Sequence, residues 1–471
     1  MDSDWHAMSE WDLALTVTRA VASAGGRALI VGGWVRDRLL NTPSKDIDLE
    51  VYGLSADRLH AILTTLGPVN TVGSSFTVYK LGPLDIALPR TESKTGQGHR
   101  GFSVTGNPNL SISDASRRRD FTINAIAWDP LTDEYYDPHN GQRDLNDRRL
   151  RMVNPSTFGE DSLRVLRALQ LSARLKFKLD AGTSDVCRQI PLDDLPAERI
   201  WTEFEKLLLQ AEQPSVGLTL ARTIGVVDQL FPELNALIDC PQEPEWHPEG
   251  DVWTHNLLVI DQARKYIHDL PHSKQVALML GATCHDFGKP STTATIDGRI
   301  RSLNHEAMGV EPATMFLDRL QIYKLSGYDV RAQVLGLVAH HLKPGMWHTA
   351  RDGVGDGAFR RLARKVDLDL LARVATADCH GRDGTFDCSA MEWFRSRAEA
   401  LGVENAPPDP ILMGRHLVGL GVAPGPQLGK VLQQIYERQL DGEITSVAEA
   451  ITAAQLLLEI RSSHIGKQTD Q

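Results

Sequence analysis

The sequence predicts an α+β protein, in which a small mixed sheet with helices comes first and all-α segments follow. Residues 28–50 carry the first half of this prediction, because they read as strand, glycine turn, helix and strand. Residues 159–177 and 185–235 carry the second half, because their apolar positions recur at helical spacing. The length of 471 residues is too great for one core and predicts roughly two to four domains.

Composition and charge are those of an ordinary globular protein with one basic region. Hydrophobic residues make up 42% and charged residues 24% of the chain. The net charge of -11 disfavours a uniformly basic nucleic-acid-binding surface. Between Arg143 and Lys178, however, nine Lys or Arg residues accompany four Asp or Glu residues. This basic belt is suited to binding the phosphates of an RNA without reading its sequence.

The cysteine pattern and the hydropathy profile predict a cytoplasmic protein. The five cysteines form an odd set with no C-x-x-C pair, and no signal peptide precedes them, which favours a reducing compartment. No apolar run approaches the roughly 18 residues that span a bilayer, so we expect no membrane partner. The sequence leaves open whether the chain is a monomer or a homodimer.

The first elements expected are a helix, a strand, a turn and a second helix. The helix lies within residues 1–25 and packs against the sheet. Residues 28–31 then form a short strand, Gly32 and Gly33 a turn, and residues 34–40 the second helix. The turn can direct backbone N–H groups and a helix N-terminus at a phosphate.

Two aspartates of the next strand are the strongest candidates for a metal site. Asp46 and Asp48 stand at i and i+2, which places both carboxylates on one face of the strand. Hard cations such as Mg²⁺ take oxygen ligands and share them with nucleotide phosphates. Residues 56–66 are expected to form a helix, and residues 78–88 a strand that supplies Asp85 as a third catalytic carboxylate. A strand-edge charge is an equally good interpretation of Asp85.

The stretch that follows the predicted sheet is polar and rich in glycine. Residues 91–116 show little periodicity, which indicates either a disordered insertion or a mobile element over an active site. The next segment, RRRDFTINAIAWDP, begins with three consecutive arginines. These arginines either contact phosphates or form a solvated surface. If the segment is helical, Asp120 and Asn124 share one face.

Residues 159–177 combine an apolar stripe of leucines with a charged cluster. Glu160, Asp161 and Arg164 gather on another face through i, i+3 and i+4 spacing. On a generic exposed helix such residues form a weak salt bridge. Alternatively, the carboxylate and the guanidinium recognise a base, because they match the donors and acceptors of cytosine or adenine and mismatch those of uracil and guanine.

Five motifs in this order resemble those of the class II nucleotidyltransferases, the family of tRNA CCA-adding enzymes and bacterial poly(A) polymerases. The motifs are GGWVRDRLL with KDIDLEVYG, RRDFTINA, YYDPHNGQRDL, EDSLR and PAERIWTEFEKLLL. The resemblance implies that Asp46 and Asp48 hold Mg²⁺, with Asp85 also catalytic, and that the glycine-rich stretch helps to switch between adding C and adding A. It also implies a nucleotide-binding set that consists of Gly32, Gly33, Arg36, Arg119, Asp120, Asn124, Asp161, Arg164 and Arg167.

Within this set, the resemblance makes Asp161 and Arg164 a protein template for the incoming base, with Glu160 in a supporting contact. The motif YYDPHNGQRDL is implied to be a hinge between a head and a neck. Arg199 and Glu203, at i and i+4, are expected to form a structural pair without direct chemistry.

A second set of candidate residues, rich in histidine, lies in the second half of the chain. An adjacent His-Asp pair inside an apolar helix needs a compensating partner, which a cation supplies. The order His, His-Asp, His, His, Asp resembles the HD phosphohydrolase superfamily, an all-helical metal fold. The resemblance implies a divalent transition metal, such as Ni, Mn or Co, held by His255, His285, Asp286 and Asp378. The candidates for a second metal or a phosphate contact are His305 and one of His340 and His341.

Three further residues near this set are open to interpretation. Lys289 either contacts a phosphate or is a solvated lysine. His247 and His348 are predicted not to be metal ligands, because lone histidines are more often packed or exposed than metal-bound.

The predicted organisation has four parts: a nucleotidyltransferase head (1–140), a helical neck (141–235), an HD domain (236–390) and a helical C-terminal tail region (391–471). The predicted function is template-independent addition of C and A to the 3′ end of tRNA, from CTP and ATP with release of pyrophosphate. We also expect HD phosphohydrolase activity on phosphate ends. Open alternatives are a CC-adding or A-adding enzyme, a poly(A) polymerase, or an HD phosphohydrolase with an RNA-binding head.

Overall fold

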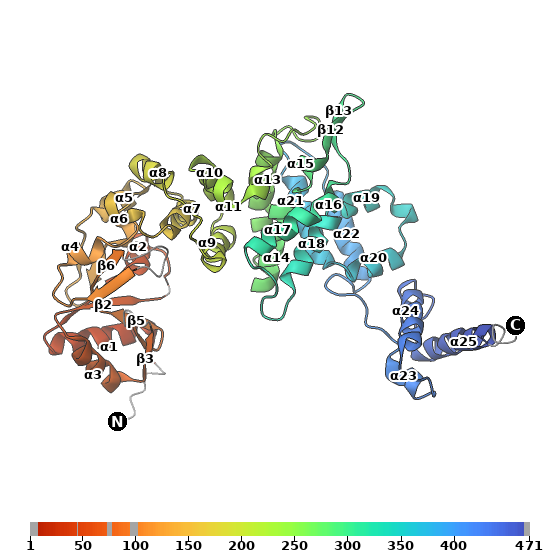
Figure 1. Cartoon of the computed structure of the whole chain (residues 1–471), viewed down its shortest axis with the longest axis horizontal. Coiled ribbons are helices and arrows are strands. Elements are labelled where there is room, and N and C mark those ends of the chain that lie inside the picture. Colours follow the sequence, from red (N-terminus) through yellow and green to blue (C-terminus); the bar gives the residue numbers. More distant parts are fainter. Residues whose placement is uncertain (1–7, 45, 73–77, 95–101, 466–471) are drawn as a thin grey trace. The chain divides into compact units, whose positions relative to one another are not determined.

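The chain divides into two compact units, Met1–Asn235 and Ala236–Gln471. The computed structural model describes residues 8–44, 46–72, 78–94 and 102–465. The first unit holds a mixed sheet with helices, and the second is mostly helical (Figure 1). This confirms the expected α+β class. The finer division into head, neck, HD domain and tail region stays a prediction.

Seven strands of the first unit form one mixed sheet with the order β3-β4-β5-β2-β1-β8-β9. Strand β1 pairs antiparallel with β2, whereas β5 pairs parallel with β2. The register places Asp48 beside Val31 on one side and beside Asp85 on the other. The strands are β1 (Arg27–Val31), β2 (Asp48–Tyr52), β3 (Val69–Val72), β4 (Val78–Leu81), β5 (Leu84–Ala87), β8 (Ala127–Asp129) and β9 (Glu134–Tyr136).

Three helices surround this sheet, as the apolar spacing predicted. They are α1 (Glu10–Ser23), α2 (Gly33–Leu39) and α3 (Ala56–Leu66). Helix α1 buries one face that includes Leu13, Val17 and Val21, and it packs against β1 and α3. Three tryptophans connect α1, α2 and β8, since their ring centroids lie 5.5 to 5.7 Å apart with nearly parallel planes. This stack fixes the helix that follows the glycine turn.

Two expected segments have a different structure. Residues 91–116 are not a continuous loop, because β6 (Arg90–Lys94) pairs antiparallel with β7 (Phe102–Gly106), and α4 (Ile112–Ser116) follows. Backbone hydrogen bonds between neighbouring segments favour the hairpin despite the weak side-chain pattern. The part of the expected mobile element over residues 95–101 lies outside the described residues. Residues 78–88 form two strands, β4 and β5, because the chain reverses at Gly82 with a φ of 58°.

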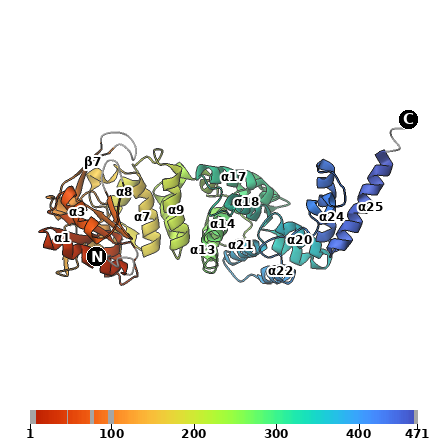
Figure 2. The ribbon, with the colours of Figure 1, turned by 90° about the horizontal axis from the view of Figure 1, so that it is seen from below.

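The rest of the first unit is helical, with short connecting strands. Its central helix α7 lies side by side with α9, as Figure 2 shows, and also packs against α10. Leu163, Leu166 and Leu169 of α7 are buried, as the leucine stripe predicted. The elements are a 3₁₀ turn (Thr122–Asn124), α5 (Gly141–Asn146), β10 (Arg149–Leu150), α6 (Pro155–Phe158), α7 (Leu163–Leu175), β11 (Lys178–Leu179), α8 (Ala181–Cys187), α9 (Ala197–Gln210), α10 (Pro214–Thr223), α11 (Val226–Leu230) and α12 (Pro232–Asn235).

Four helices form the centre of the second unit: α13 (Val252–Arg264), α14 (His272–Cys284), α18 (Val330–His340) and α21 (Leu368–His380). An antiparallel hairpin, β12 and β13, departs from the expected all-helical fold. The other elements are α15 (Lys289–Thr292), β12 (Thr293–Ile296), β13 (Arg299–Ser302), α16 (His305–Met308), α17 (Val310–Arg319), α19 (Lys343–Thr349), a 3₁₀ turn (Arg351–Gly353), α20 (Asp356–Ala363) and α22 (Ser389–Ala400).

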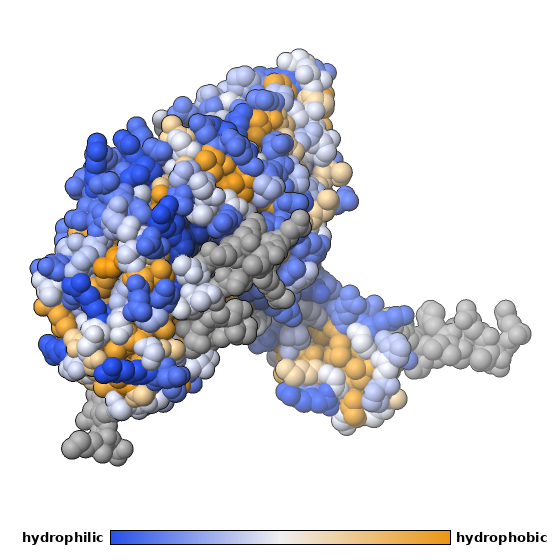
Figure 3. Space-filling view, turned by 60° about the vertical axis from the view of Figure 1, so that its left-hand side comes forward, coloured by the Kyte–Doolittle hydropathy of each residue, from blue (hydrophilic) through white to orange (hydrophobic). Residues whose placement is uncertain are grey.

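The C-terminal helices have a small core of their own. They are α23 (Gly414–Val418), α24 (Pro426–Leu440) and α25 (Val447–Ile465), and their buried residues include Leu417, Val431 and Ile435. Apolar side chains also gather on the surface of this part of the chain (Figure 3). Among the described parts of the chain, every helix is too short or too polar to span a lipid bilayer.

Candidate active site of the first unit and candidate metal centre of the second

The carboxylates of the first unit meet where β2 begins. Asp48 is the first residue of β2 and pairs in register with Asp85 of β5. Asp46 precedes the strand in a left-handed conformation, with a φ of 67°. The like charges of Asp85 and Asp46 both act on Asp48, and Lys80 holds Asp85 in an ion pair of 2.8 Å. The predicted third carboxylate therefore lies beside the other two, on the neighbouring strand.

The pKa of Asp48 is sensitive to this crowding. Loss of hydration raises the pKa of Asp48 to about 6, the charges of Asp85 and Asp46 add to the shift, and Arg119 opposes it. A bound cation would offset the repulsion between the negative charges of these three carboxylates. The donor set consists of carboxylates alone, which fits Mg²⁺ better than a softer metal.

The glycine turn leaves space beside these carboxylates. Gly32 has a φ of 79°, in the left-handed region that favours glycine. A side chain at Gly32 would lie 3.4 Å from Nη1 of Arg119 and 3.5 Å from Oδ2 of Asp48. Glycine therefore keeps open the space between the guanidinium of Arg119 and the carboxylate of Asp48.

A cavity of about 330 Å³ adjoins Asp48 and is strongly basic. Seven arginines and three aspartates line it, which creates a positive field suited to a triphosphate. Its lining includes every residue of the predicted nucleotide-binding set. The lining consists of Gly32, Gly33, Arg36, Asp48, Arg90, Arg118, Arg119, Asp120, Asn124, Asp161, Leu163, Arg164, Arg167 and Arg199.

A buried glutamate that the sequence did not single out holds two of these arginines. Oε1 of Glu50 lies 3.0 Å from Nη2 of Arg118 and 3.8 Å from Nη2 of Arg119. The hydroxyl of Tyr52 donates to its other oxygen at 2.7 Å. Burial alone would raise the pKa of Glu50, but Arg119 and Arg118 outweigh it and lower the pKa. Glu50 thus stays ionised and orients both guanidinium groups at the cavity.

Asp120 and Asn124 share a hydrogen-bond network, although no α-helix joins them and only a 3₁₀ turn, Thr122–Asn124, forms there. The side-chain amide of Asn124 donates to Oδ1 of Asp120 at 3.0 Å and accepts from Arg36 at 2.9 Å. Arg167 forms an ion pair of 2.6 Å with Asp120. Asp120 and Asn124 are buried, so this network fixes Arg36 and Arg167 at the cavity wall.

Asp161 and Arg164, the predicted base-reading pair, contact other groups and do not form an i,i+3 salt bridge with each other. Helix α7 begins at Leu163, so Asp161 precedes it and forms two contacts of 3.3 Å with Arg199. Arg164 donates instead to the backbone carbonyls of Thr157, at 2.9 Å, and Arg118, at 2.6 Å. Asp161, Arg164 and Arg199 all line the cavity.

The expected Arg199–Glu203 pair is wrong. Glu203 is buried and forms an ion pair of 2.8 Å with Lys206, whereas Arg199 pairs with Asp161. The i,i+4 rule describes neighbours on one helix and does not account for the close packing of α9 against α7.

In the second unit, buried histidines and aspartates converge from several helices. Nε2 of His255, on α13, lies 3.0 Å from Asp378 on α21. His285 and Asp286 follow α14, and Nε2 of His285 lies 3.3 Å from Oδ2 of Asp286. Nε2 of His305 lies 3.4 Å from the other oxygen of Asp286. The structure therefore places the four predicted ligands of the first metal in one cluster.

His341, and not His340, completes the cluster. Nε2 of His341 lies 3.2 Å from Nε2 of His305. Each of these two residues belongs, with Asp286, to a group whose possible ligand atoms all lie within 4.8 Å of one another. His340 is only half-buried and lies outside the metal-binding groups found among the described residues.

Backbone carbonyls set the tautomers of these histidines. Nδ1 of His285 donates to Ala282 at 2.7 Å, Nδ1 of His305 to Ser302 at 2.7 Å, and Nδ1 of His341 to Val338 at 2.9 Å. A carbonyl can only accept, so each Nδ1 carries a proton, and Nε2 is the ring nitrogen that each histidine offers to the cluster. Such anchoring is typical of metal-binding histidines.

The cluster brings possible metal-ligand atoms into direct contact. Nε2 of His305 and Nε2 of His341 face one another across 3.2 Å. Burial and the charges of His285 and His305 lower the pKa of His341 to about 3, so this ring is neutral. Nε2 of His285 is buried without a hydrogen-bond partner among the described residues. Nitrogen and carboxylate donors together fit a divalent transition metal.

A cavity of about 330 Å³ opens onto this centre. Lys289 lines it and is buried, with Nζ 2.7 Å from Asp286 and 2.7 Å from Oε1 of Gln242, so the interpretation as a solvated lysine is wrong. The lining comprises Gln242, Glu243, Trp246, His247, Asp286, Lys289, Ile300, Ser302, His305, His341, Leu342, Asp378 and Arg382.

The structure also adds residues that the histidine pattern did not indicate. Oε1 of Glu249 lies 2.8 Å from Nδ1 of both His247 and His255. His247, predicted as a non-ligand, therefore touches the centre through Glu249 and lines its cavity. His348, also predicted as a non-ligand, packs against the ring of Trp393. No pattern around Glu249 marks it in the sequence, because its partners arise from the fold.

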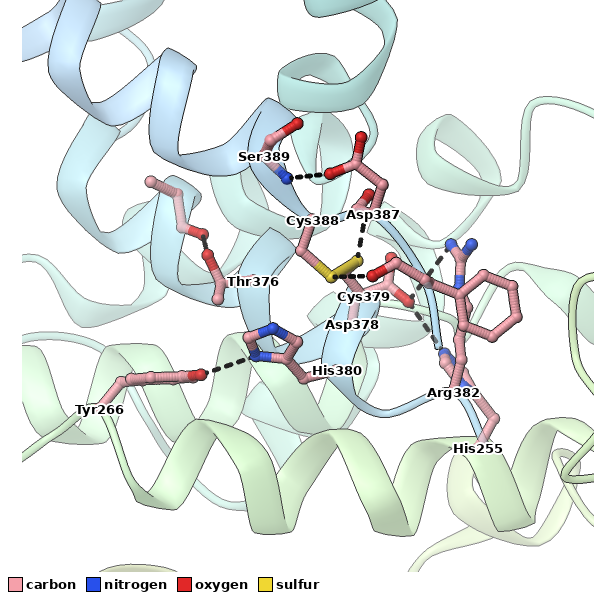
Figure 4. The surroundings of a disulfide bond; sticks show 12 residues. His255, Tyr266, Thr376, Asp378, Cys379, His380, Arg382, Asp387, Cys388 and Ser389 are labelled. Atoms are coloured by element: carbon pink, nitrogen blue, oxygen red, sulfur yellow. Dashed lines mark hydrogen bonds and ion pairs between the residues drawn. A yellow bond between two sulfur atoms is a disulfide. The ribbon is translucent and has the colours of Figure 1, made fainter. Parts of the chain in front are cut away.

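A disulfide between Cys379 and Cys388 lies beside this centre (Figure 4). It follows Asp378 directly and closes a loop that carries Arg382, whose guanidinium lies 4.0 Å from Asp378. The bond differs from the expectation of thiols in a reducing compartment. The chain returns after α21 through Gly381 and Gly384, which brings the two Cα atoms to 6.0 Å. The remaining cysteines, Cys187, Cys240 and Cys284, are buried thiols.

Known proteins resemble both parts of the chain. The family described as "Poly A polymerase head domain" matches residues 28–151, and "Probable RNA and SrmB- binding site of polymerase A" matches residues 177–238. The Multifunctional CCA protein of Xanthomonas campestris pv. campestris strain B100 is 35% identical over 422 residues, which cover 86% of this chain and 95% of that protein. The Multifunctional CCA protein of Xylella fastidiosa strain 9a5c is 36% identical over 398 residues, or 80% and 90% of the two chains.

A solved structure shares the fold. The crystal structure of the Bacillus stearothermophilus CCA-adding enzyme in complex with CTP matches with a TM-score of 0.56 and 21% identity, over 98% of this chain and 100% of that one. The head fold and its carboxylate-edged basic cavity define a nucleotidyltransferase, a class that uses divalent metal ions. More narrowly, the chain belongs to the family of the multifunctional CCA proteins.

Proposed function

We propose that the first unit adds C and A to the 3′ end of tRNA, from CTP and ATP, without a nucleic-acid template and with release of pyrophosphate. The observation that carries this proposal is the cavity that joins Asp48 to seven arginines. The names of the relatives and of the solved CCA-adding enzyme, which binds CTP, support it. With tRNA as its substrate, the protein would act in the cytoplasm.

The carboxylates at the edge of the cavity supply the metal site. Asp46, Asp48 and Asp85 would hold Mg²⁺, which lowers the pKa of a 3′-hydroxyl and neutralises charge on a triphosphate. The space beside Gly32 admits phosphate oxygens between Asp48 and Arg119. Arg36 and Arg167, held by Asn124 and Asp120, bind the remaining phosphate oxygens and the sugar.

The base is selected by Asp161 and Arg164. A carboxylate accepts from the exocyclic amine of cytosine or adenine, and a guanidinium donates to the adjacent ring nitrogen or carbonyl oxygen. Arg199 holds Asp161 at the cavity through two contacts, so the carboxylate is oriented before a nucleotide enters. Uracil and guanine present the opposite pattern and leave unpaired groups in the cavity.

Sequencing of tRNA 3′ ends tests this proposal. A transcript that ends at the discriminator base is incubated with the full chain, Mg²⁺ and all four NTPs. We expect CCA and no further nucleotide. Addition of CC alone, or of A only to a CC-ended transcript, would identify a partial enzyme, and an A-tail would identify a poly(A) polymerase. The variant Asp161→Ala is expected to incorporate UTP and GTP as well, and unchanged selectivity would contradict the template role.

The second unit supports a second activity, metal-dependent phosphohydrolysis of phosphate ends. The observation in favour is the cluster of facing Nε2 atoms of His305 and His341 beside Asp286. His255, His285, Asp286 and Asp378 would hold a transition metal, with His305 and His341 at a second metal or a phosphate. Such a metal supplies an acidified water that attacks phosphorus. Lys289, buried at the cavity, would bind a phosphate oxygen.

Release of phosphate tests the second activity. The Ni²⁺-loaded or Mn²⁺-loaded chain is incubated with a nucleoside 2′,3′-cyclic phosphate and with a nucleoside monophosphate. Turnover that His285→Ala abolishes would support the proposal, and equal turnover by wild type and variant would contradict it.

The domain organisation that goes with these two proposed activities has four parts. They are a head at 1–140, a neck at 141–235, an HD domain at 236–390 and a tail region at 391–471.

A further inference from the structure

An exposed aromatic ring lies at the mouth of the cavity in the second unit. Trp246 is 51% exposed, and it lines the same cavity as the buried Asp286 and His341. Ile300 and Leu342, both half-buried, line it as well. We call Trp246, Ile300 and Leu342 the apolar rim. The cavity therefore has a charged, metal-binding interior and an apolar, partly aromatic entrance.

The segment that carries Trp246 is fixed by contacts on both sides. Carboxylate oxygen Oε2 of Glu243 accepts from the backbone of Ile300 at 2.9 Å, and the carbonyl of Glu243 accepts from the backbone of Trp246 at 3.0 Å. Glu245 forms an ion pair of 3.0 Å with Arg299. These contacts tie the backbone of the turn to strand β13, while Trp246 itself stays half exposed.

The same turn is joined to the metal centre. Gln242 accepts from Lys289 at 2.7 Å, and Lys289 contacts Asp286 at 2.7 Å. A short chain of contacts thus links the segment that carries Trp246 to the candidate metal centre. A second cation, Arg382, lines the cavity, and its Nε is buried without a hydrogen-bond partner among the described residues.

An aromatic face, two cations and a metal centre in one cavity suit a particular class of ligand. A bare phosphoester would use the cations and the metal but would leave the indole in water. A nucleoside phosphoester uses all of them, because its phosphate pairs with the cations while its base stacks on the indole. Stacking tolerates every base, so this arrangement recognises a nucleotide without reading its sequence.

We propose that Trp246 is a specificity-determining residue of the second site, whose indole stacks on the base of a nucleoside phosphoester. The inference rests on the proposed phosphohydrolase function. In the reaction, the oxygen of one water forms a bond to phosphorus, one P–O ester bond breaks, and the leaving oxygen takes up a proton. Trp246 takes no part in these bonds and acts by holding the nucleoside.

The test compares two substrates that differ in the base. The Mn²⁺-loaded full chain hydrolyses adenosine 2′,3′-cyclic phosphate and, separately, methyl riboside 2,3-cyclic phosphate, which lacks the base. Trp246→Ala is expected to raise KM for the adenosine compound about tenfold, with kcat nearly unchanged, since stacking on one base is worth about 1–3 kcal/mol. KM for the baseless compound stays unchanged. Trp246→Phe keeps most of the affinity because it keeps an aromatic face.

Two results would overturn the proposal. Equal losses for both substrates would indicate a structural role for Trp246, and no loss for either would indicate that the ring serves another partner. Tyr323→Ala is the matched control, since Tyr323 is a 54% exposed aromatic residue of the same unit outside the cavity lining. We expect this variant to behave as wild type.

A binding measurement separates this proposal from the phosphohydrolase function on which it rests. If wild type hydrolyses neither substrate, the phosphohydrolase proposal fails, and calorimetry with adenosine 3′-phosphate then decides the role of Trp246. About tenfold weaker binding to Trp246→Ala would support it, and equal binding would overturn it. In a second experiment, wild type and Trp246→Ala are compared on a tRNA transcript that ends in a 2′,3′-cyclic phosphate. A larger effect of the variant on that transcript would identify the RNA end as the source of the nucleotide.

Discussion

The two cavities of the protein have the same volume, about 330 Å³, and opposite designs. In the first unit, the candidate metal ligands are carboxylates at the start of strand β2 and on the neighbouring strand β5, and seven arginines line the cavity beside Asp48. In the second unit, buried histidines and aspartates lie against one another, and backbone carbonyls accept hydrogen bonds from Nδ1 of His285 and His341. We therefore expect the first site to need an anionic ligand to complete its metal coordination, and the second site to hold a metal without one.

This difference follows from where each site obtains its negative charge. Mg²⁺ keeps much of its hydration and is commonly shared between one or two carboxylates and substrate phosphates. A transition metal bound by nitrogen and carboxylate donors needs no phosphate to complete its coordination. We therefore expect the head to bind its metal with the nucleotide and the second unit to carry its metal at all times.

The largest predicted effect separates two adjacent histidines. His341→Ala removes a ring from the buried cluster, whereas His340→Ala removes a half-buried ring outside it. After gel filtration of Mn²⁺-loaded protein, we expect less Mn²⁺ per chain in His341→Ala and about a hundredfold slower phosphate release, since metal-assisted attack is worth several kcal/mol. His340→Ala should retain both properties. Equal losses in the two variants would remove the assignment of His341.

The next largest effect is expected at Glu249, which contacts the candidate metal ligand His255. Glu249→Gln weakens the contacts with Nδ1 of both His255 and His247 without removing volume. Loss of such a support typically lowers metal affinity about 10–100-fold. Competition with a metal-binding dye measures the change, and Glu311→Gln, an exposed glutamate on α17, is the control. An unchanged affinity would mean that Glu249 does not act through His255.

A matching substitution in the head should have a smaller effect. Glu50→Gln loses the charge that orients Arg118 and Arg119, and hydrogen bonds to charged groups contribute about 1.5–3 kcal/mol. KM for CTP and for ATP should rise together by about tenfold, measured by incorporation into a tRNA transcript. Base selectivity should not change, because Glu50 does not contact Asp161. Incorporation of UTP by this variant would contradict a purely positioning role.

The smallest effect is expected at the disulfide. Cys388→Ser opens the loop that carries Arg382, but contacts from Arg382 to Asp378 and from Asp383 to Glu249 remain. KM for a nucleoside 2′,3′-cyclic phosphate should rise about two- to fivefold, which is below 1 kcal/mol. CCA addition serves as the internal control and should stay constant. A loss of bound Mn²⁺ would show that the bond supports the metal centre itself.

The parts of both sites that the sequence predicted are those with local patterns. Residues 28–50 combine strand, turn and helix signals, and the fold places Asp48 beside Gly32 as expected. The sequence also indicated the His285-Asp286 pair, because two polar residues in an apolar segment need a partner, although the pair follows the end of α14 and does not lie within it. The sequence left Asp85 open between a third carboxylate and a strand-edge charge, and the register of β5 with β2 places it beside Asp48.

The remaining parts depend on contacts between distant segments. Glu50 and Glu249 are single acidic residues whose arginine and histidine partners come from other elements. Arg199 reaches Asp161 because α9 packs on α7, which an i,i+4 rule does not describe. The disulfide depends on the return of the chain after α21. No periodicity within one segment carries such information.

The central claim is that the two cavities perform independent chemistry, and a crossed measurement tests it most directly. Wild type, Asp48→Ala and His341→Ala are each assayed for CCA addition by 3′-end sequencing and for phosphate release with Mn²⁺. We predict that Asp48→Ala loses only CCA addition and that His341→Ala loses only phosphate release. CCA addition that survives in Asp48→Ala, or the loss of both activities in either variant, would contradict the account.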